Sequence, residues 1–270
     1  MAGGWARDQL GRALEDAGFR GVRAVKVQEH VGRFDVHLAA RDVHGLWSLL
    51  PVRQRWRMIP VLLDHAVFID VETDGGRTPN AMTVLSVRTR DRAACWVRGQ
   101  DPTPALQLVE SASAVVTFAG AQLDLPLLKA AWPQLQMPTL HVDVAAVVRQ
   151  LGVHGGLKVV EAQMGWTRAE HVRALRGPDA IPLWQRWTLE RDRQALELLC
   201  EYAMEDVWSL PRLAAWVHDS LVGRIRAAVG GLPETLPACE AWQERAEGGP
   251  MMLKATLAAI RAAAETTPQT

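Results

Sequence analysis

The stretch Ala66-Val-Phe-Ile-Asp-Val-Glu-Thr-Asp-Gly75 decides the fold class of this chain. Residues 66–71 form a nearly continuous apolar run of strand length, which is typical of a central strand that is buried on both faces. Asp70 and Glu72 stand two residues apart, and side chains at this spacing project from the same face of a strand. We therefore expect a buried strand that carries a pair of carboxylates close to its end.

Further strands and helices are indicated on the carboxyl side of this stretch. The apolar and turn patterns predict strands at 82–87, 93–97, 114–118 and 140–142. They predict helices up to 110 after Pro104 and over 123–131, 144–151, 157–164 and 191–217. Three strands followed by helices that alternate with single strands indicate an α/β fold, with a mixed central sheet flanked by helices.

Both ends of the chain are expected to form extensions. Residues 22–27 and 34–38 alternate between apolar and polar side chains on either side of Gly32, which favours a hairpin. Short helices are expected at 5–17 and 252–264. The predicted organisation is an N-terminal extension over 1–60, with the hairpin and a lead-in segment, a central domain over 61–217, and a helical C-terminal extension over 218–270.

The composition excludes several classes of protein. Among 270 residues, Lys and Arg together number 30 and Asp and Glu together number 30, so the chain is not a bulk polycation that coats phosphates. Residues 1–60 nevertheless hold ten basic and six acidic residues. Three cysteines without a CxxC spacing indicate neither a disulfide framework nor a zinc site. No signal segment or membrane span is recognisable, so a soluble cytoplasmic protein without membrane contact is expected.

Further side chains of interest follow the first carboxylate pair. Asp124 comes after the strand at 114–118, in the first turn of a helix, where the helix dipole favours anions. Tyr202 and Asp206 are four residues apart on the long helix and share one face. Taken singly, each acid could simply cap a turn or a helix. The four acids together, placed in this order on a strand, at a helix start and on a late helix, indicate a shared site.

Three motifs carry a resemblance to a known family. Ile69-Asp-Val-Glu-Thr-Asp-Gly75, Thr117-Phe-Ala-Gly-Ala-Gln-Leu-Asp-Leu-Pro126 and Tyr202-Ala-Met-Glu-Asp206 resemble the exonuclease motifs of the DEDD superfamily, in its tyrosine-bearing branch. The chain also resembles the YprB-type RNase H-like predicted nucleases through Leu46-Trp-Ser-Leu-Leu-Pro51, His141-Val-Asp-Val144, Gly156-Leu-Lys-Val-Val-Glu161 and Met164-Gly165. The resemblance covers roughly residues 46–215 and implies an RNase H-like fold.

The activity that this resemblance implies is hydrolysis of phosphodiester bonds with two divalent cations. Carboxylate oxygens are ligands that suit Mg²⁺ or Mn²⁺, and a pair of such ions can activate water and stabilise the leaving oxygen. By resemblance, Asp70 would bridge both ions, Glu72 and Asp206 would complete one site, and Asp124 would hold the second ion through water. Tyr202 would orient the attacking water.

Substrate contacts are expected at two further places. The resemblance places Thr73, Phe118 and Ala119 beside the substrate, although the family carries Asn where this chain has Ala119. The missing amide removes a hydrogen bond worth about 1 kcal/mol. Phosphate contacts are also expected from a basic segment on the amino side of the first strand, formed by Arg53, Arg55 and Arg57.

Three functions remain open from the sequence. The first is a metal-dependent 3′–5′ exonuclease that acts on a single-stranded end of DNA or RNA. The second is a weakened or inactive module that binds nucleic acid or protein, which the substitution at Ala119 favours and the intact acids oppose. The third is a phosphodiesterase that acts on small nucleotides, for which a closed pocket would be expected in place of an open groove.

Overall fold

The computed structural model describes residue 12, residues 14–229 and residue 258. The chain divides into two compact units, residues 1–55 and residues 56–270. The C-terminal helix predicted at 252–264 and most of the helix predicted at 5–17 lie outside the described residues. The first unit contains the helices α2 (Val22–Ala39) and α3 (Val43–Leu49). A 3₁₀ helix, η1 (Val52–Met58), crosses the division between the units.

Helix α2 replaces the predicted hairpin, so that prediction is wrong. The half-buried side chains of this segment recur every three or four residues, which is the period of a helix face and not of a strand. These side chains are Ala24, Val27, Val31, Phe34 and His37. Asp42 then caps α3 by accepting a hydrogen bond from the Gly45 N–H at 2.9 Å. Gly32, read as a turn in the sequence, lies inside the helix.

The second unit is built on a five-stranded sheet with the strand order β3-β2-β1-β4-β5. Strands β1 and β2 and strands β2 and β3 pair antiparallel, whereas β1 with β4 and β4 with β5 pair parallel. The predicted mixed sheet flanked by helices is confirmed. The strands are β1 (Ala66–Thr73), β2 (Met82–Arg88), β3 (Ala93–Val97), β4 (Ala114–Thr117) and β5 (Leu140–Asp143).

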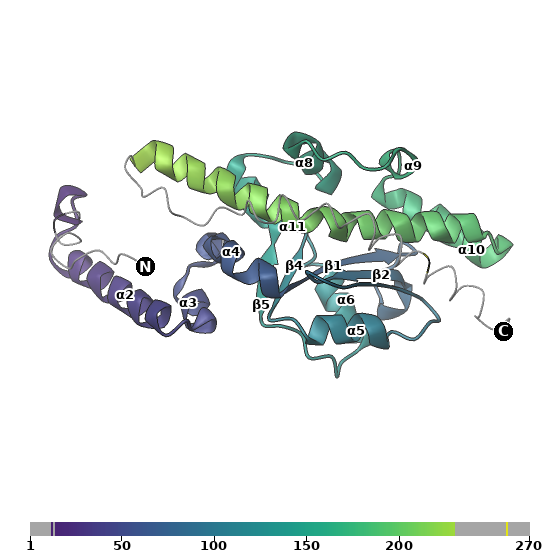
Figure 1. Cartoon of the computed structure of the whole chain (residues 1–270), viewed down its shortest axis with the longest axis horizontal. Coiled ribbons are helices and arrows are strands. Elements are labelled where there is room, and N and C mark those ends of the chain that lie inside the picture. The colour runs from purple at the N-terminus through teal and green to yellow at the C-terminus, as the bar shows by residue number, and fades with distance from the viewer. Residues whose placement is uncertain (1–11, 13, 230–257, 259–270) are drawn as a thin grey trace. The chain divides into compact units, whose positions relative to one another are not determined.

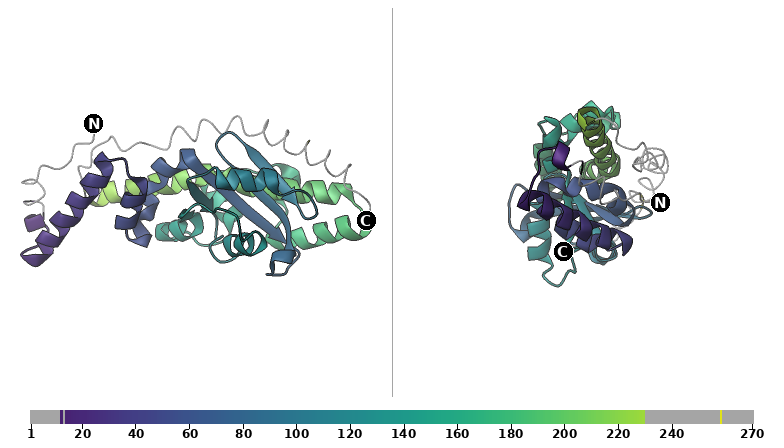
Figure 2. Two further views of the ribbon diagram at one scale, coloured as in Figure 1. Left: turned by 90° about the horizontal axis from the view of Figure 1, so that it is seen from below. Right: turned by 90° about the vertical axis from the view of Figure 1, so that its left-hand side faces the viewer.

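Helices cover both faces of the sheet (Figure 1). The described α-helices of the second unit are α4 (Ile59–Leu62), α5 (Thr103–Glu110), α6 (Asp124–Ala131), α7 (Val144–Val148), α8 (Leu157–Met164), α9 (Glu170–Arg173), α10 (Ala180–Glu190) and α11 (Arg193–Val229). Short 3₁₀ helices lie between them, at η2 (Leu63–His65), η3 (Pro79–Ala81), η4 (Arg149–Leu151) and η5 (Gly177–Asp179). Helix α11 lies along one face against β1 and β2, and α5 and α6 lie on the other face. The view from below in Figure 2 shows α11, in light green, passing behind the strands.

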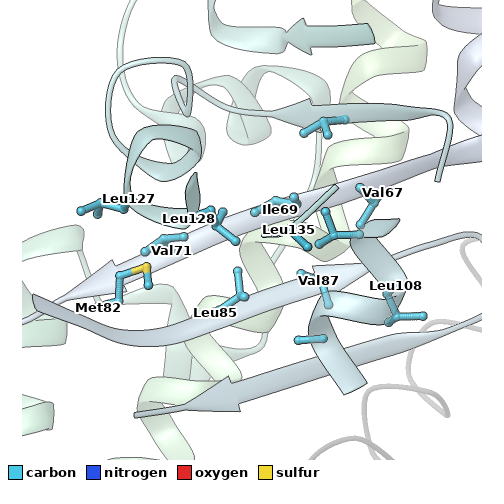
Figure 3. Close-up of a cluster of buried hydrophobic side chains, with 13 residues drawn as sticks. Val67, Ile69, Val71, Met82, Leu85, Val87, Leu108, Leu127, Leu128 and Leu135 are labelled. Atoms are coloured by element: carbon cyan, nitrogen blue, oxygen red, sulfur yellow. The ribbon is translucent and has the colours of Figure 1, made fainter. Parts of the chain in front are cut away.

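The alternation of side chains along β1 separates the core from the site. Val67, Ile69 and Val71 point toward α5 and α6, where they pack against Leu108 and Leu128 in one buried cluster (Figure 3). The even-numbered residues of β1 project from the opposite face, toward α11. The strand therefore presents apolar side chains alone to one layer, and Asp70 and Glu72, which follow Phe68, to the other.

Helix α11 is longer than the sequence predicts. It continues past residue 217 to Val229, so the boundary expected at 217/218 falls inside a helix. Leu221 and Val222 are buried, and Arg224 donates hydrogen bonds to the carbonyl oxygens of Gln150 at 3.4 Å and Leu151 at 2.8 Å. These contacts extend the helix beyond the segment that covers the sheet. In the part of the chain that the structure describes, none of the helices is long and apolar enough to span a membrane.

Candidate active site

Three carboxylates meet between β1 and α11. Asp70 and Glu72 project from the α11-facing side of β1, and Asp206 projects from α11. One oxygen from each carboxylate lies within 4.8 Å of the others, a spacing that allows the three groups to hold one metal ion. Among the described residues, this is the only group of three or more metal-ligating side chains with that spacing. The structure thus brings together residues that are separated by more than 130 positions in the sequence.

Asp124 lies near this group but outside it. It is the first residue of α6 and is buried, and its charge raises the pKa of both Asp70 and Glu72. Gly120 allows its approach, since a Cβ at that position would stand 2.7 Å from the Asp124 Oδ2 atom. A fourth carboxylate therefore faces the cluster without sharing its immediate ligand geometry.

All four acids have raised pKa values. Burial raises the pKa of Asp70 and of Glu72 well above the usual range, and the negative charge of Asp206 adds to the effect in both. Burial and the neighbouring Asp143 raise the pKa of Asp124 to about 7. The pKa of Asp206 rises to about 6 because of burial, although Arg168 opposes this shift. Like charges held close together in a partly buried site are costly to a fold, and a bound cation would lower that cost.

Asp206 belongs to a buried ion-pair network with Arg168 and Glu161. The Arg168 guanidinium donates to both oxygens of Glu161 at 2.7 Å, and its Nη1 atom lies 2.5 Å from the Asp206 Oδ1 atom. The side chains of Arg168 and Glu161 are only 3% and 2% exposed. Neither Glu161 nor Arg168 was among the predicted site residues. Glu161 could have been noticed in the sequence, because it stands at helical spacing from Leu157 and Met164 on the inner face of a predicted helix.

Tyr202 lies one helical turn before Asp206 and is buried beside the same cluster. Burial, together with the charges of Asp206, Glu72 and Asp70, raises its pKa. The Lys158 ammonium lies 4.8 Å from the centre of the Tyr202 ring. The phenol therefore keeps its proton at neutral pH and can donate a hydrogen bond, but it is a poor base.

A family model described as the RNase_H superfamily matches residues 67–218, which include most of α11 and all of the sheet except Ala66. The chain belongs to the RNase H superfamily. None of the curated protein sequences matches this chain.

Three solved structures are similar to this RNase H superfamily chain. Brucella melitensis NrnC is 20% identical with a TM-score of 0.41, and the match covers 69% of this chain and 86% of NrnC. A structure described as the apo form of the nuclease is 18% identical with a TM-score of 0.42, over 70% of this chain and 86% of that chain. Escherichia coli RNase D, an exoribonuclease involved in structured RNA processing, is 16% identical with a TM-score of 0.42, over 76% of this chain. This chain spans about half of RNase D, at 48% of its length.

The loop after β4 adopts a conformation that Ala119 fits poorly. Ala119 has φ of 62°, in the left-handed region that Asn and Gly tolerate better than Ala. Its N–H donates to the Asp143 Oδ1 atom at 2.9 Å, which fixes the loop against the end of β5. The Asn that the resemblance implies at this position would therefore also suit the backbone.

The remaining expected substrate residues are placed differently from one another. Thr73 ends β1 directly after Glu72, where its hydroxyl accepts a hydrogen bond from the Gly75 N–H at 3.3 Å, and Phe118 is half-buried at the end of β4.

Arg57 stacks 4.8 Å over Trp56, which packs on His218 of α11. His218 is twelve residues beyond Asp206, or about 18 Å along a helix. The structure therefore does not bring Arg57 to the cluster.

Arg53 and Arg55 belong to the first unit, whereas the carboxylates belong to the second. The Arg55 guanidinium lies 4.8 Å over the Trp47 ring, a contact within that first unit. A contact of these two arginines with phosphate stays a prediction.

The carboxylate cluster fits a divalent metal centre. The Asp70 Oδ2 atom is buried and has no hydrogen-bond partner, so it is an acceptor without a donor. All four side chains that face the centre offer hard oxygen ligands of the kind that Mg²⁺ and Mn²⁺ prefer. The donors and their charge therefore match the cofactor that this superfamily fold implies.

Proposed function

We propose that this protein is a metal-dependent nuclease that hydrolyses phosphodiester bonds of DNA or RNA, acting as a 3′–5′ exonuclease of the tyrosine-bearing DEDD branch and of the YprB type. The observation that carries the proposal is the meeting of Asp70, Glu72 and Asp206 within 4.8 Å, with a buried Asp70 oxygen that lacks a donor. Such an arrangement is unfavourable unless cations are bound.

Each side chain has a distinct task in this proposal. Asp70, Glu72 and Asp206 would hold one of two ions, Mg²⁺ or Mn²⁺, and Asp70 and Asp124 would hold the other. Bound there, the ions supply an activated water and neutralise charge on the leaving oxygen. Tyr202 would orient the attacking water by donating a hydrogen bond from its phenolic O–H.

A strand labelled at its 5′ end tests the activity and its direction together. With Mn²⁺ or Mg²⁺, we expect the label to move through successively shorter products as nucleotides leave the 3′ end. Asp70→Asn should lower the rate by more than about 100-fold, because even indirect partners of metal ligands contribute about 10–100-fold. Asp64→Asn is the matched control, since Asp64 is exposed and pairs with Arg90 at the opposite end of β1.

Two outcomes would contradict this proposal. A rate that is unchanged in Asp70→Asn would remove the cluster from the chemistry. Products that persist when the 3′ end is chemically blocked would contradict the direction.

A module that binds nucleic acid or protein without hydrolysing it is the second candidate. It is favoured by Ala119, whose methyl group replaces a hydrogen-bonding amide at a strained position. This candidate predicts that wild-type protein binds a labelled strand but leaves it intact with either ion. The assay above therefore separates the two functions.

A further inference from the structure

A cleft of about 790 Å³ adjoins the carboxylate cluster and has no role in the proposal above. It is formed by α8, the loop that follows it, α9 and the residues just after α9, which in Figure 1 lie over α11 on the side away from the sheet. Its volume lies within the range of about 300–1,000 Å³ that ligand sites occupy. The cleft is open to solvent and can therefore admit a chain that continues beyond it.

The lining of the cleft is strongly basic. Lys158, Arg168, Arg173 and Arg176 line it, and among the lining residues Glu161 is the only carboxylate. Glu161 is fully engaged by Arg168 through two hydrogen bonds of 2.7 Å. The positive charge of the other three side chains therefore has no counterpart in the lining, which is the arrangement that attracts phosphate groups.

Two residues join the cleft to the carboxylates. Arg168 lines the cleft and lies 2.5 Å from Asp206, and Lys158 lines the cleft and stands 4.8 Å from the Tyr202 ring. A strand with one phosphate at the carboxylate cluster would thus meet the basic lining with its neighbouring phosphates. The basic lining of the cleft and the carboxylate cluster therefore lie side by side.

An aromatic side chain lies among these cations. Trp166 is half-buried and lines the cleft, and the Arg212 guanidinium lies 5.5 Å from the centre of its ring. Aromatic rings among cations are the usual platform for unpaired bases, because every base has a face that can stack. Base pairing and stacking within a duplex would prevent this contact.

We propose that this cleft binds the single-stranded segment of nucleic acid next to the bond that is cleaved. Lys158, Arg173 and Arg176 contact its phosphates, and Trp166 stacks on one of its bases. The inference rests on the proposed nuclease function, and it adds the part of the protein that selects a single strand over a duplex.

Binding measured without divalent ions tests the cleft separately from hydrolysis. The probes are fluorescein-labelled single strands of DNA and of RNA of about ten nucleotides, within the range that single-strand sites cover, and a duplex of the same length. Fluorescence anisotropy in EDTA should show tighter binding of a single strand than of the duplex. In Arg173→Ala/Arg176→Ala, the slope of log affinity against log salt should fall by about 1.4, since each phosphate contact to a single strand contributes about 0.7.

Trp166→Ala should weaken single-strand binding about tenfold with little change in the salt slope, because stacking is not ionic. The matched control is Arg90→Ala/Arg92→Ala, which removes two cations from the β2–β3 turn and should keep the wild-type slope. Circular dichroism confirms that each variant is folded.

Equal salt slopes in the cleft variant and the wild type would overturn the inference, as would equal affinity for the duplex. These failures are distinct from failure of the nuclease proposal. If Mn²⁺-dependent cleavage is present but the cleft variants bind normally, only the cleft assignment is wrong. If the cleft variants lose binding but wild-type protein never cleaves, the cleft assignment holds and the nuclease proposal is wrong.

Discussion

Arg168 is the residue on which the geometry of Asp206 depends. Its guanidinium is shared between two acids in a nearly dry environment, with Glu161 on one side and Asp206 on the other. Removing one member of such a network leaves a buried charge without a partner, which is far more costly than removing a whole pair.

Replacement of Arg168 by methionine should therefore lower the free energy of unfolding by about 3–5 kcal/mol, because Glu161 is left buried and charged. Arg168→Met/Glu161→Leu should recover part of that loss, since Glu161 leaves with its partner while Asp206 stays without one. Urea unfolding of both variants measures the difference. A double variant that is no more stable than Arg168→Met would show that the pairing with Glu161 is not what stabilises this region.

Ala119 offers a second test at the residue scale. Its φ of 62° costs an alanine about 1–2 kcal/mol relative to glycine, which is offset in part by the greater chain entropy of glycine. Ala119→Gly should therefore raise the free energy of unfolding by about 0.5–1 kcal/mol. Ala119→Asn should also stabilise the fold and, if the amide contacts substrate, speed cleavage about fivefold, as expected for a bond worth about 1 kcal/mol.

Comparison of these two substitutions separates backbone strain from substrate contact. Ala121→Gly is the control, because Ala121 donates to the same Asp143 side chain but does not have a positive φ. Thermal unfolding of the three variants gives the result. Equal stabilisation by Ala119→Gly and Ala121→Gly would contradict the role of strain.

The sequence predicted residues well where a local pattern carried the signal. Asp70, Glu72, Tyr202 and Asp206 all lie where the strand and helix periods place them. Arg168 could not be found in this way, because its two partners come from α8 and α11 and meet only after the chain has folded.

Among the elements, α11 is held to the sheet by a buried arginine. Arg88 of β2 is 5% exposed, donates to the Trp208 carbonyl oxygen at 3.0 Å and lies 4.0 Å over the Trp208 ring. Burial lowers its pKa to about 10, so it stays charged at neutral pH. This contact fixes the helix two residues beyond Asp206 and so helps to set the height of Asp206 above β1.

Arg88→Met should lower the free energy of unfolding by about 1.5–3 kcal/mol, the usual range for a hydrogen bond from a charged donor. Arg90→Met, which removes an exposed ion pair with Asp64, should cost no more than about 1 kcal/mol. Chemical denaturation of the two variants measures both effects. Similar losses in the two would mean that Arg88 does not anchor α11.

Element prediction was correct where burial and period agreed. Strands β1, β2 and β3 match their predicted ranges to within two residues, because long apolar runs bounded by turns leave few alternatives. The hairpin prediction for residues 22–38 was wrong. The first six of these residues alternate as in a strand, while the half-buried side chains of the whole segment follow the helical period. Without the partner surface of α3, the sequence offered no means to choose between the two periods.

For the whole molecule, the carboxylates make stability depend on pH and on metal. The raised pKa of Asp124, about 7, and of Asp206, about 6, means that these groups favour the folded chain while they are protonated. That contribution is fully present below the unfolded pKa of about 4 and is lost as pH rises through the folded values.

In EDTA, the melting temperature should therefore fall between about pH 5 and pH 7, and Asp206→Asn should flatten this dependence. Saturating Mn²⁺ at pH 7 should restore stability, by about 2.7 kcal/mol at a concentration 100 times the Kd. Differential scanning calorimetry across this pH range checks both effects. A melting temperature that rises with pH in EDTA would contradict the assignment of raised pKa values.

Calorimetric titration of the full chain with Mn²⁺ tests the central claim, that Asp70, Glu72 and Asp206 form a divalent-cation site. The wild type should bind Mn²⁺ with measurable heat, and Asp64→Asn should bind it equally well. Asp70→Asn should weaken binding by more than about 100-fold, since a direct ligand counts for more than an indirect one. Absence of Mn²⁺ binding by the wild type, or equal binding by Asp70→Asn, would contradict the claim.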